Sequence, residues 1–168
     1  KTTKEGNYSI KLRRKIDTSE IEEIWNGDKE KEKLQVEYFG IGDLEVSHND
    51  KYLAYSLDTK GSEYYTIFLR EIISNKIITK KISNTSGSIT FSLDDKYIFY
   101  SSLDENHRAR KIFRHKIGDY NNSDELVFEE RSEAFTVGIN ISSDEKYYFI
   151  TTSDHNTSEQ YYFKVDEK

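Results

Sequence analysis

Short apolar runs separated by polar turns follow one another along most of this chain, and one turn-and-run pattern recurs. It stands as "SHNDKYLAY" at 47–55, "SLDDKYIFY" at 92–100 and "SSDEKYYFI" at 142–150. The run after each turn is apolar at nearly every position instead of alternating, which is typical of a strand buried on both faces. The turns begin 45 and 50 residues apart. A period of this size indicates a repeat architecture.

Each copy of the pattern lies inside a larger unit of predicted strands. A first strand precedes the turn, at 39–46, 87–91 and 135–141. After an acidic loop, a third strand follows at 64–70, 110–117 and 160–165. A fourth strand closes the first two units, at 76–82 and 125–130. Four short antiparallel strands per unit, separated by turns, predict the blade of a β-propeller.

The segment before the first complete unit is expected to be the end of an earlier blade. Residues 8–16 and 20–25 are predicted as its last two strands, and 28–38 as a short helix in a connection. The predicted fold class is therefore all-β: a partial β-propeller of about three to three and a half four-stranded antiparallel blades. Residues 1–168 are predicted to be one propeller domain, with blade-like units at 8–26, 39–82, 86–130 and 135–165. A closed propeller needs at least about four blades, so we expect the chain to be a fragment.

Composition supports a folded, β-rich chain. Aromatic residues make up 14% of the sequence; they pack well on a pleated surface and are scarce in disordered chains. The formal net charge of −6 argues against a nucleic-acid partner and is compatible with a cationic one. No apolar run approaches 18 residues and no signal peptide is visible, so we expect no contact with a membrane. A cytoplasmic location is inferred from those missing signals alone.

Candidate catalytic groups are scarce in the sequence. It contains no Gly-x-Ser-x-Gly, the pentapeptide that carries the nucleophile of α/β hydrolases. Ser153, Asp154 and His155 are the residue types of a triad, but neighbours on one loop cannot build its geometry. The four histidines are widely spread, with no metal-site spacing and no evident nucleophile–base–orienter set. We therefore expect no catalytic residue, no metal and no cofactor.

A basic run at 107–116 raises the alternative of nucleic-acid binding. The run is predicted to form a single strand, and the chain as a whole is acidic. We therefore expect salt bridges between blades, or an exposed propeller face, at this strand and no nucleic-acid partner.

Three longer stretches carry a family resemblance. They are "EVSHNDKYLAYSLDTKGSEYYTIFLR", "NTSGSITFSLDDKYIFYSSLDENHRARKIFRHKIG" and "VFEERSEAFTVGINISSDEKYYFITTSDHNTSE", which cover most of 40–159. They resemble the amino-terminal propeller region of the prolyl oligopeptidase family, in its oligopeptidase B (protease II) branch. Ala109 departs from the pattern, because a proline is expected after the arginine. The resemblance implies a seven-bladed propeller that covers an α/β-hydrolase domain, which carries a Ser–Asp–His triad and cleaves short peptides after Arg or Lys.

The resemblance also implies which loops matter. In a propeller the fourth-to-first and second-to-third connections share one face, and in this family that face meets the hydrolase domain. The candidate substrate-facing or interdomain residues are Ser86, Thr85, Ser88, Asp58, Glu63, Asp104, Glu133, Phe135, Asp154 and Glu159. Ser86 matches a position where proline-specific members place a pocket-lining residue. The repeated acids are expected to draw cationic peptides inward; the alternative is that these are plain solvated turns.

The function implied by the resemblance is that of a non-catalytic propeller part of a serine oligopeptidase. It would cover and gate the active site of a hydrolase domain absent from this chain. Its partners would be that domain, in the same parent chain, and short basic peptides. The chain alone is expected to hydrolyse nothing, and to self-associate through the apolar faces and strand edge that a partial propeller exposes. The alternative is an independent propeller-like protein-interaction scaffold with no peptidase partner.

Overall fold

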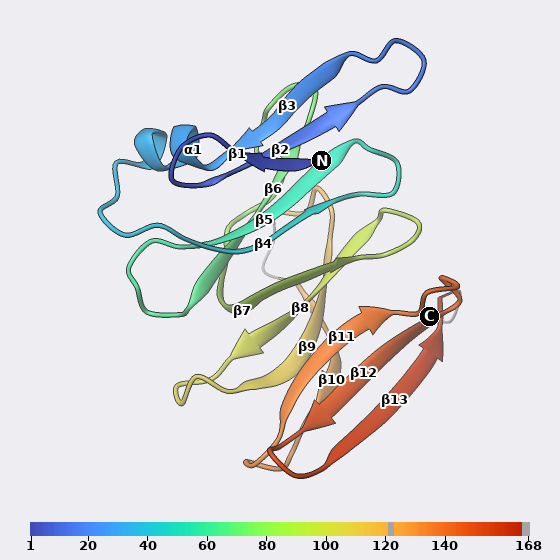
Figure 1. Cartoon of the computed structure of the whole chain (residues 1–168). Coiled ribbons are helices and arrows are strands. Elements are labelled where there is room, and N and C mark those ends of the chain that lie inside the picture. The colour runs from blue at the N-terminus through green and yellow to red at the C-terminus, as the bar shows by residue number, and fades with distance from the viewer. Residues whose placement is uncertain (121–122, 166–168) are drawn as a thin grey trace. The chain divides into compact units, whose positions relative to one another are not determined.

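The computed structural model describes residues 1–120 and 123–165, and the predicted all-β class is confirmed (Figure 1). The chain divides into two compact units, Lys1–Phe39 and Gly40–Lys168. Within the described ranges, no helix is long and apolar enough to span a membrane.

The first unit is a small antiparallel sheet followed by one helix. Strands β1 (Thr2–Lys4), β2 (Ser9–Arg14) and β3 (Ile21–Asn26) are hydrogen-bonded in that order, and α1 (Gly27–Leu34) follows directly. β1 was not predicted from the sequence. The predicted helix 28–38 is too long at its end, because Gln35 takes a left-handed conformation and its N–H bonds back to Lys31 and Glu32. Such a cap ends a helix.

The second unit contains two antiparallel sheets (Figure 1). The larger has seven strands, each hydrogen-bonded to the next along the chain: β4 (Gly40–Val46), β5 (Tyr52–Asp58), β6 (Tyr65–Glu71), β7 (Ile82–Phe91), β8 (Tyr97–Leu103), β9 (Ala109–Lys116) and β10 (Glu125–Glu129). The smaller, orange to red in Figure 1, has β11 (Thr136–Ile141), β12 (Tyr147–Ser153) and β13 (Ser158–Lys164). We call β4–β6 with 72–85 the first repeat, 86–129 the second and β11–β13 the third.

Strand β7 corrects the prediction of separate strands at 76–82 and 87–91. Before Ile82, the predicted fourth strand makes only an isolated bridge between Ile77 and Arg70. From Ile82 the chain first pairs with β6 and then, without a break, with β8. Two repeats therefore share one continuous strand. Hydrogen bonding does not divide the larger sheet into blades, and the blade count stays a prediction.

The hydrophobic core lies between successive repeats. One cluster joins the first and second repeats, with members Ala54, Ile67, Leu69, Ile82, Ile89, Phe91, Ile98 and Tyr100. A second joins the second and third repeats, with members Phe99, Ile112, Val137, Ile139, Tyr148 and Ile150. On β8, Ile98 and Tyr100 pack into the first cluster while Phe99 packs into the second. The burial of both strand faces predicted from the apolar run "YIFY" is thereby confirmed.

The recurring turn is held by its own side chains. Each serine hydroxyl accepts a hydrogen bond of 2.9–3.0 Å from a backbone N–H five residues on, in the pairs Ser47–Tyr52, Ser92–Tyr97 and Ser142–Tyr147. The fourth turn residue is left-handed in every copy: Asp50, Asp95 and Glu145. Short polar side chains favour such reversals of the backbone. This requirement explains why the same turn sequence recurs in each repeat.

Candidate functional site

The connections before each first strand and after each second strand lie along one edge of the second unit. The strand register shows this, because the start of each first strand pairs with the end of the second: Gly40 with Asp58, Thr85 with Ser102, and Thr136 with Ser153. We call this edge the loop face; it comprises the connections 59–64, 104–108, 130–135 and 154–157 and the bend 84–88 of β7.

The ten residues predicted from the sequence lie on or beside the loop face, but they differ in exposure. Two are buried, Asp58 and Thr85. Four are half-buried: Ser86, Asp104, Phe135 and Asp154. Four are exposed: Glu63, Ser88, Glu133 and Glu159. A peptide or a neighbouring domain can therefore reach only part of the predicted set directly.

Asp58 organises the loop that follows β5. Its side chain is 2% exposed, and its two carboxylate oxygens accept backbone hydrogen bonds from Lys60 (2.8 Å), Gly61 (3.0 Å) and Glu63 (2.7 Å). Burial raises the pKa of the Asp58 carboxyl, but these N–H donors lower it more, so the pKa lies below its ordinary value. Asp58 is thus a buried anion bonded to its own loop.

Asp104 and Asp154 occupy the same place in the next two repeats. Asp104 Oδ1 accepts from the N–H groups of Asn106 (2.9 Å) and Arg108 (3.0 Å). Asp154 Oδ1 accepts from those of Asn156 and Thr157, both at 2.7 Å. The N–H of Arg108 leads in lowering the pKa of Asp104, and that of Asn156 in lowering the pKa of Asp154. The acidic repeat therefore caps three equivalent loops.

Ser86 stands at the bend of β7, between two residues with positive φ. Asn84 has φ 60° and Gly87 has φ 94°. A Cβ on Gly87 would lie 2.9 Å from the Tyr65 ring, so glycine is required there for both its conformation and its size. The Ser56 hydroxyl donates to the Gly87 carbonyl at 2.6 Å. The Tyr65 ring and the Ser56 hydroxyl both contact Gly87 and so fix the bend, which places Ser86 and Ser88 at the loop face.

Thr85 supports the same bend from inside. Its hydroxyl donates to the Tyr65 carbonyl at 3.1 Å and accepts from the Gly87 N–H at 3.3 Å. Thr85 is thus a buried residue that stabilises the bend, whereas the sequence had grouped it with the substrate-facing or interdomain candidates.

Neighbouring loops of the loop face contact one another. The Tyr64 hydroxyl of the first repeat donates to the Asp104 carbonyl at 2.9 Å, and its ring lies 3.9 Å from that of His107. Arg108 reaches onward to the Ala134 carbonyl at 3.4 Å. Sequence reasoning missed Tyr64, although an aromatic residue directly after an acidic loop is a signal that could have found it. The loops form a continuous rim, and not three independent turns.

A groove of about 590 Å³ opens beside the rim, between the first and second repeats. Ser83 and Asn84 line one side of it, and Arg110, Lys111 and Glu129 line the other. Lys111 pairs with Glu129 at 3.2 Å, so charges of both signs face the groove. Tyr100, Leu103 and Phe113 also line the groove, so its lining is part polar and part apolar.

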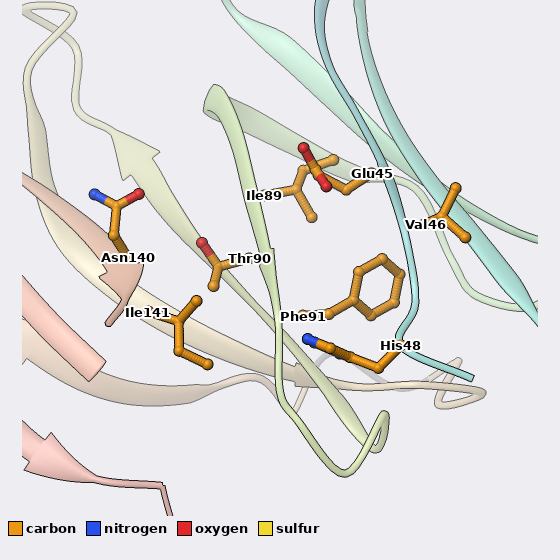
Figure 2. Close-up of a pocket in the computed structure, with 8 residues that line it drawn as sticks. All are labelled: Glu45, Val46, His48, Ile89, Thr90, Phe91, Asn140 and Ile141. Carbon is orange, nitrogen blue, oxygen red and sulfur yellow. The ribbon is translucent and has the colours of Figure 1, made fainter. Parts of the chain in front are cut away.

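A smaller hollow of about 260 Å³ lies among the first strands of the three repeats (Figure 2). Figure 2 shows its lining side chains arriving from β4 and the turn after it, from β7 and from β11. The Thr90 hydroxyl donates to the Ile139 carbonyl, and His48 Nδ1 lies 3.2 Å from Asp95 Oδ1. These polar groups are tied into contacts between repeats and provide no nucleophile. Among the described residues, no group of three or more His, Cys, Asp or Glu side chains could hold a metal ion.

One buried group brings an aspartate, a histidine and a threonine side chain into contact, which the sequence had not suggested. His115 Nδ1 lies 2.8 Å from Asp124 Oδ1, and its Nε2 contacts the Thr79 hydroxyl. The order Asp–His–Thr is that of a triad. His115 is fully buried and Thr79 is 3% exposed, so the group is enclosed and has no open access to a substrate; the Thr79 hydroxyl also lies within hydrogen-bond distance, 2.8 Å, of the Asp119 carbonyl. The sequence could not reveal this group, since Thr79 and His115 are 36 residues apart.

Comparison with known proteins gives one consistent result. Residues 1–168 match the family described as "Prolyl oligopeptidase, N-terminal beta-propeller domain". Protease 2 of Moraxella lacunata is 30% identical over 132 residues, which are 77% of this chain and 19% of that protein. Dipeptidyl aminopeptidase BI of Pseudoxanthomonas mexicana is 31% identical over 124 residues, 73% of this chain and 17% of that protein. The chain thus spans about a fifth of the length of these relatives.

Solved structures show the same fold. Oligopeptidase B from Leishmania major superposes with a TM-score of 0.86 at 23% identity, over 96% of this chain and 23% of that one. Oligopeptidase B from Trypanosoma brucei, with covalently bound antipain, superposes with a TM-score of 0.81 at 23% identity and the same coverage.

Proposed function

The chain belongs to the prolyl oligopeptidase N-terminal β-propeller family, and from that premise we propose that it is the non-catalytic propeller part of a serine oligopeptidase. The resemblance inferred from the sequence is thereby confirmed. The observation that carries the proposal is the match of the family over all 168 residues. In the proposal, a hydrolase domain of the same parent chain supplies the triad, and the enzyme cleaves short peptides after Arg or Lys. The names of the relatives, Protease 2 and oligopeptidase B, support a peptidase that acts on short peptides; cleavage after Arg or Lys is the finer part of the proposal.

The loop face is the surface that we assign to the hydrolase domain and to the entry of peptides. Its rim of contacts through Tyr64, Asp104 and Arg108 supports a fixed shape that another domain can cover. Ser86, presented on a braced bend, is the residue that we place nearest to substrate. The gating of the active site by this face is part of the proposal.

In this proposal, it is mainly the exposed glutamates that attract basic peptides electrostatically. Asp58 is buried and bonded to its loop, so it contributes charge without contact. Glu63, Glu133 and Glu159 are exposed on or beside the loop face. Charge of one sign along a cleft raises the local concentration of opposite charges, and salt weakens the effect.

The full-length parent polypeptide tests the proposal. We expect it to contain Gly-x-Ser-x-Gly downstream, to react with a serine-directed inhibitor and to cleave Arg- and Lys-containing chromogenic peptides. The 168-residue chain, purified in parallel as the control, should be inactive in both assays. A parent that lacks the pentapeptide and the activity would contradict the proposal and favour the interaction scaffold. Activity of the short chain that survives repurification would contradict its non-catalytic role.

A further inference from the structure

The loop face itself contains bonds that an Arg- or Lys-directed peptidase could cut. Within its connections, lysine and arginine occur three times, as Lys60, Arg108 and Arg131. All three residues are exposed. Exposed polar loops are the places at which proteases preferentially nick a folded chain. In the proposed function these loops border an active site that cleaves after the same two residue types, so their survival needs a structural cause.

The bond between Lys60 and Gly61 is held by the buried Asp58. The N–H of Lys60 donates to Asp58 Oδ1 at 2.8 Å. The N–H of Gly61, which is part of the bond itself, donates to the same oxygen at 3.0 Å. The Glu63 N–H donates to Asp58 Oδ2 at 2.7 Å, and both Gly61 and Glu63 have positive φ. The loop is therefore curled around one carboxylate, and the nitrogen of the bond is fixed to it.

The bond between Arg108 and Ala109 is held at its carbonyl. The Arg108 carbonyl accepts from the Asp104 N–H at 3.0 Å. The Arg108 N–H donates to Asp104 Oδ1, also at 3.0 Å. Ala109 is buried and pairs with Leu103 in the β8–β9 register. The residues on both sides of this bond are therefore fixed.

The bond between Arg131 and Ser132 is held at both ends. The Arg131 carbonyl accepts from Arg110 Nη2 at 2.8 Å, and the same nitrogen donates to the Glu130 carbonyl at 3.0 Å. The Ser132 N–H donates to Glu130 Oε1 at 2.7 Å. A guanidinium from β9 thus fixes the carbonyl of this bond, and a carboxylate of the same loop fixes its nitrogen.

These contacts engage the groups that a serine peptidase has to reach. Such an enzyme attacks the carbonyl carbon, binds the carbonyl oxygen in an oxyanion hole and protonates the departing nitrogen. Water then completes the hydrolysis, which leaves a carboxylate on one fragment and an amine on the other. In each of the three bonds, the carbonyl oxygen or the N–H is already hydrogen-bonded within the chain. Cleavage therefore requires the loop to open first, and its rate falls with the population of the open state.

We propose that Asp58, Asp104 and Arg110 protect the loop face from the Arg- and Lys-directed active site that it covers, an inference that rests on the proposed function. In that function a gate can exclude other proteins, but it cannot exclude the loop face, because this surface borders the site. Each of the three side chains keeps one basic loop closed, so that the enzyme meets no open substrate in its own propeller.

Trypsin, which cleaves after the same residue types, tests this protection on the 168-residue chain without a hydrolase domain. Cleavage after Lys60, followed by mass spectrometry, should be about 100-fold slower than in a synthetic peptide of residues 54–67, in which Lys60 is the single basic residue. Asp58→Ala should raise the rate in the chain at least about 10-fold, because three N–H donors lose their acceptor. The same substitution in the peptide corrects for its direct effect on trypsin. Equal rates for the unaltered chain and its peptide would overturn the proposal.

A second bond separates local opening from global unfolding. Arg70 lies in β6 and is 4% exposed, so trypsin reaches the bond to Glu71 only when the sheet unfolds. In the Asp58→Ala variant, the bond after Lys60 should be cut while the bond after Arg70 stays intact. Simultaneous cleavage of both bonds in a folded variant would contradict local protection; should the variant fail to fold, the ratio between the unaltered chain and its peptide decides.

Two neighbouring cations on β9 provide a matched pair of variants. Arg110→Gln frees the Arg131 carbonyl and should raise cleavage after Arg131 at least about 10-fold. Lys111→Gln breaks the more exposed pair with Glu129 and should leave that rate unchanged. Neither variant should alter cleavage after Lys60. Equal effects of the two variants on cleavage after Arg131 would count against the role of Arg110.

The full-length parent polypeptide tests whether the enzyme is guarded against itself. On incubation, its Asp58→Ala variant should be cut after Lys60, and a serine-directed inhibitor should prevent the cut. A variant that cleaves Arg-containing chromogenic peptides but leaves its own loop intact would overturn the protective role, while the proposed function would stand. A parent polypeptide without peptidase activity would overturn the proposed function and self-protection with it, whereas the trypsin rates would still report whether Asp58 and Arg110 keep their loops closed.

Discussion

At the level of single residues, the repeated aspartates of the loop face act on their own backbone. Asp58, Asp104 and Asp154 each end a second strand or follow it directly, and each accepts at least two N–H groups of the loop beyond. An acid repeated at one place in successive units can therefore be a structural requirement. The glutamates of the loop face, Glu63, Glu133 and Glu159, are instead exposed to solvent.

Replacing Asp58 by Ala should destabilise the second unit by about 2 kcal/mol at neutral pH, because three backbone N–H donors lose their acceptor. The pKa of Asp58 is lowered in the fold, so its contribution is present above the ordinary value of 3.8 and is lost as the pH falls through the lower folded value. Urea unfolding of both proteins at neutral and acidic pH measures this. Glu105→Ala, on an exposed loop residue, is the control. A difference between Asp58→Ala and the parent that does not shrink in acid would contradict the prediction.

At the level of elements, β7 is the strand on which the arrangement of the repeats depends. It pairs with β6 through Ile82 and Thr85 and with β8 through Thr85 to Phe91. The change of partner occurs at the bend, where Asn84 and Gly87 have positive φ. A strand that belongs to two repeats couples them covalently and through hydrogen bonds.

A series of three glycine-to-alanine variants tests the bend. Gly87→Ala should destabilise the chain by about 2–3 kcal/mol, because it meets both an unfavourable φ and the Tyr65 ring. Gly118→Ala has a positive φ but open space, so it should cost about 1 kcal/mol. Gly138→Ala has neither constraint and should be neutral or slightly stabilising. Thermal and urea unfolding give the order, and a Gly87→Ala variant as stable as Gly138→Ala would refute the account of the bend.

At the level of the whole molecule, one sheet face of the third repeat and the outer edge of β13 are left uncovered by the part of the chain that the structure describes. Tyr148, Ile150 and Phe163 pack against the second repeat. On the opposite face, Tyr162 is 69% exposed and its ring contacts those of Tyr147 and Phe149. β13 is the last strand in its sheet. Exposed aromatic surface next to an unpaired edge favours association.

We predict that the isolated chain self-associates through this face and edge. Tyr162→Lys should shift the association to higher protein concentration, because it places a charge in the aromatic patch and on the edge strand. Tyr120→Lys, at a tyrosine that is 63% exposed outside the patch, should leave it unchanged. Light scattering over a range of concentrations measures both. A monomer of 19.8 kDa at every concentration up to millimolar would contradict the prediction.

The sequence alone determined the features that depend on neighbours along the chain. The turn at Ser92 and the strand "YIFY" follow from side chains within nine residues, since turn hydrogen bonds and apolar runs are local. The all-β class follows from their repetition. The resemblance identified the family and the loops of the candidate site.

Only the tertiary structure decided which groups meet across repeats. The shared strand β7 depends on a bend whose glycine is fitted to the Tyr65 ring from an earlier strand. Thr79 and His115 are separated by 36 residues, and no local pattern pairs them. Even the exposure of Asp58, predicted as a surface acid, is set by the loop that folds over it. Burial and hydrogen-bond partners of this kind arise from packing between segments distant in sequence, and such packing is not encoded in any one stretch of residues.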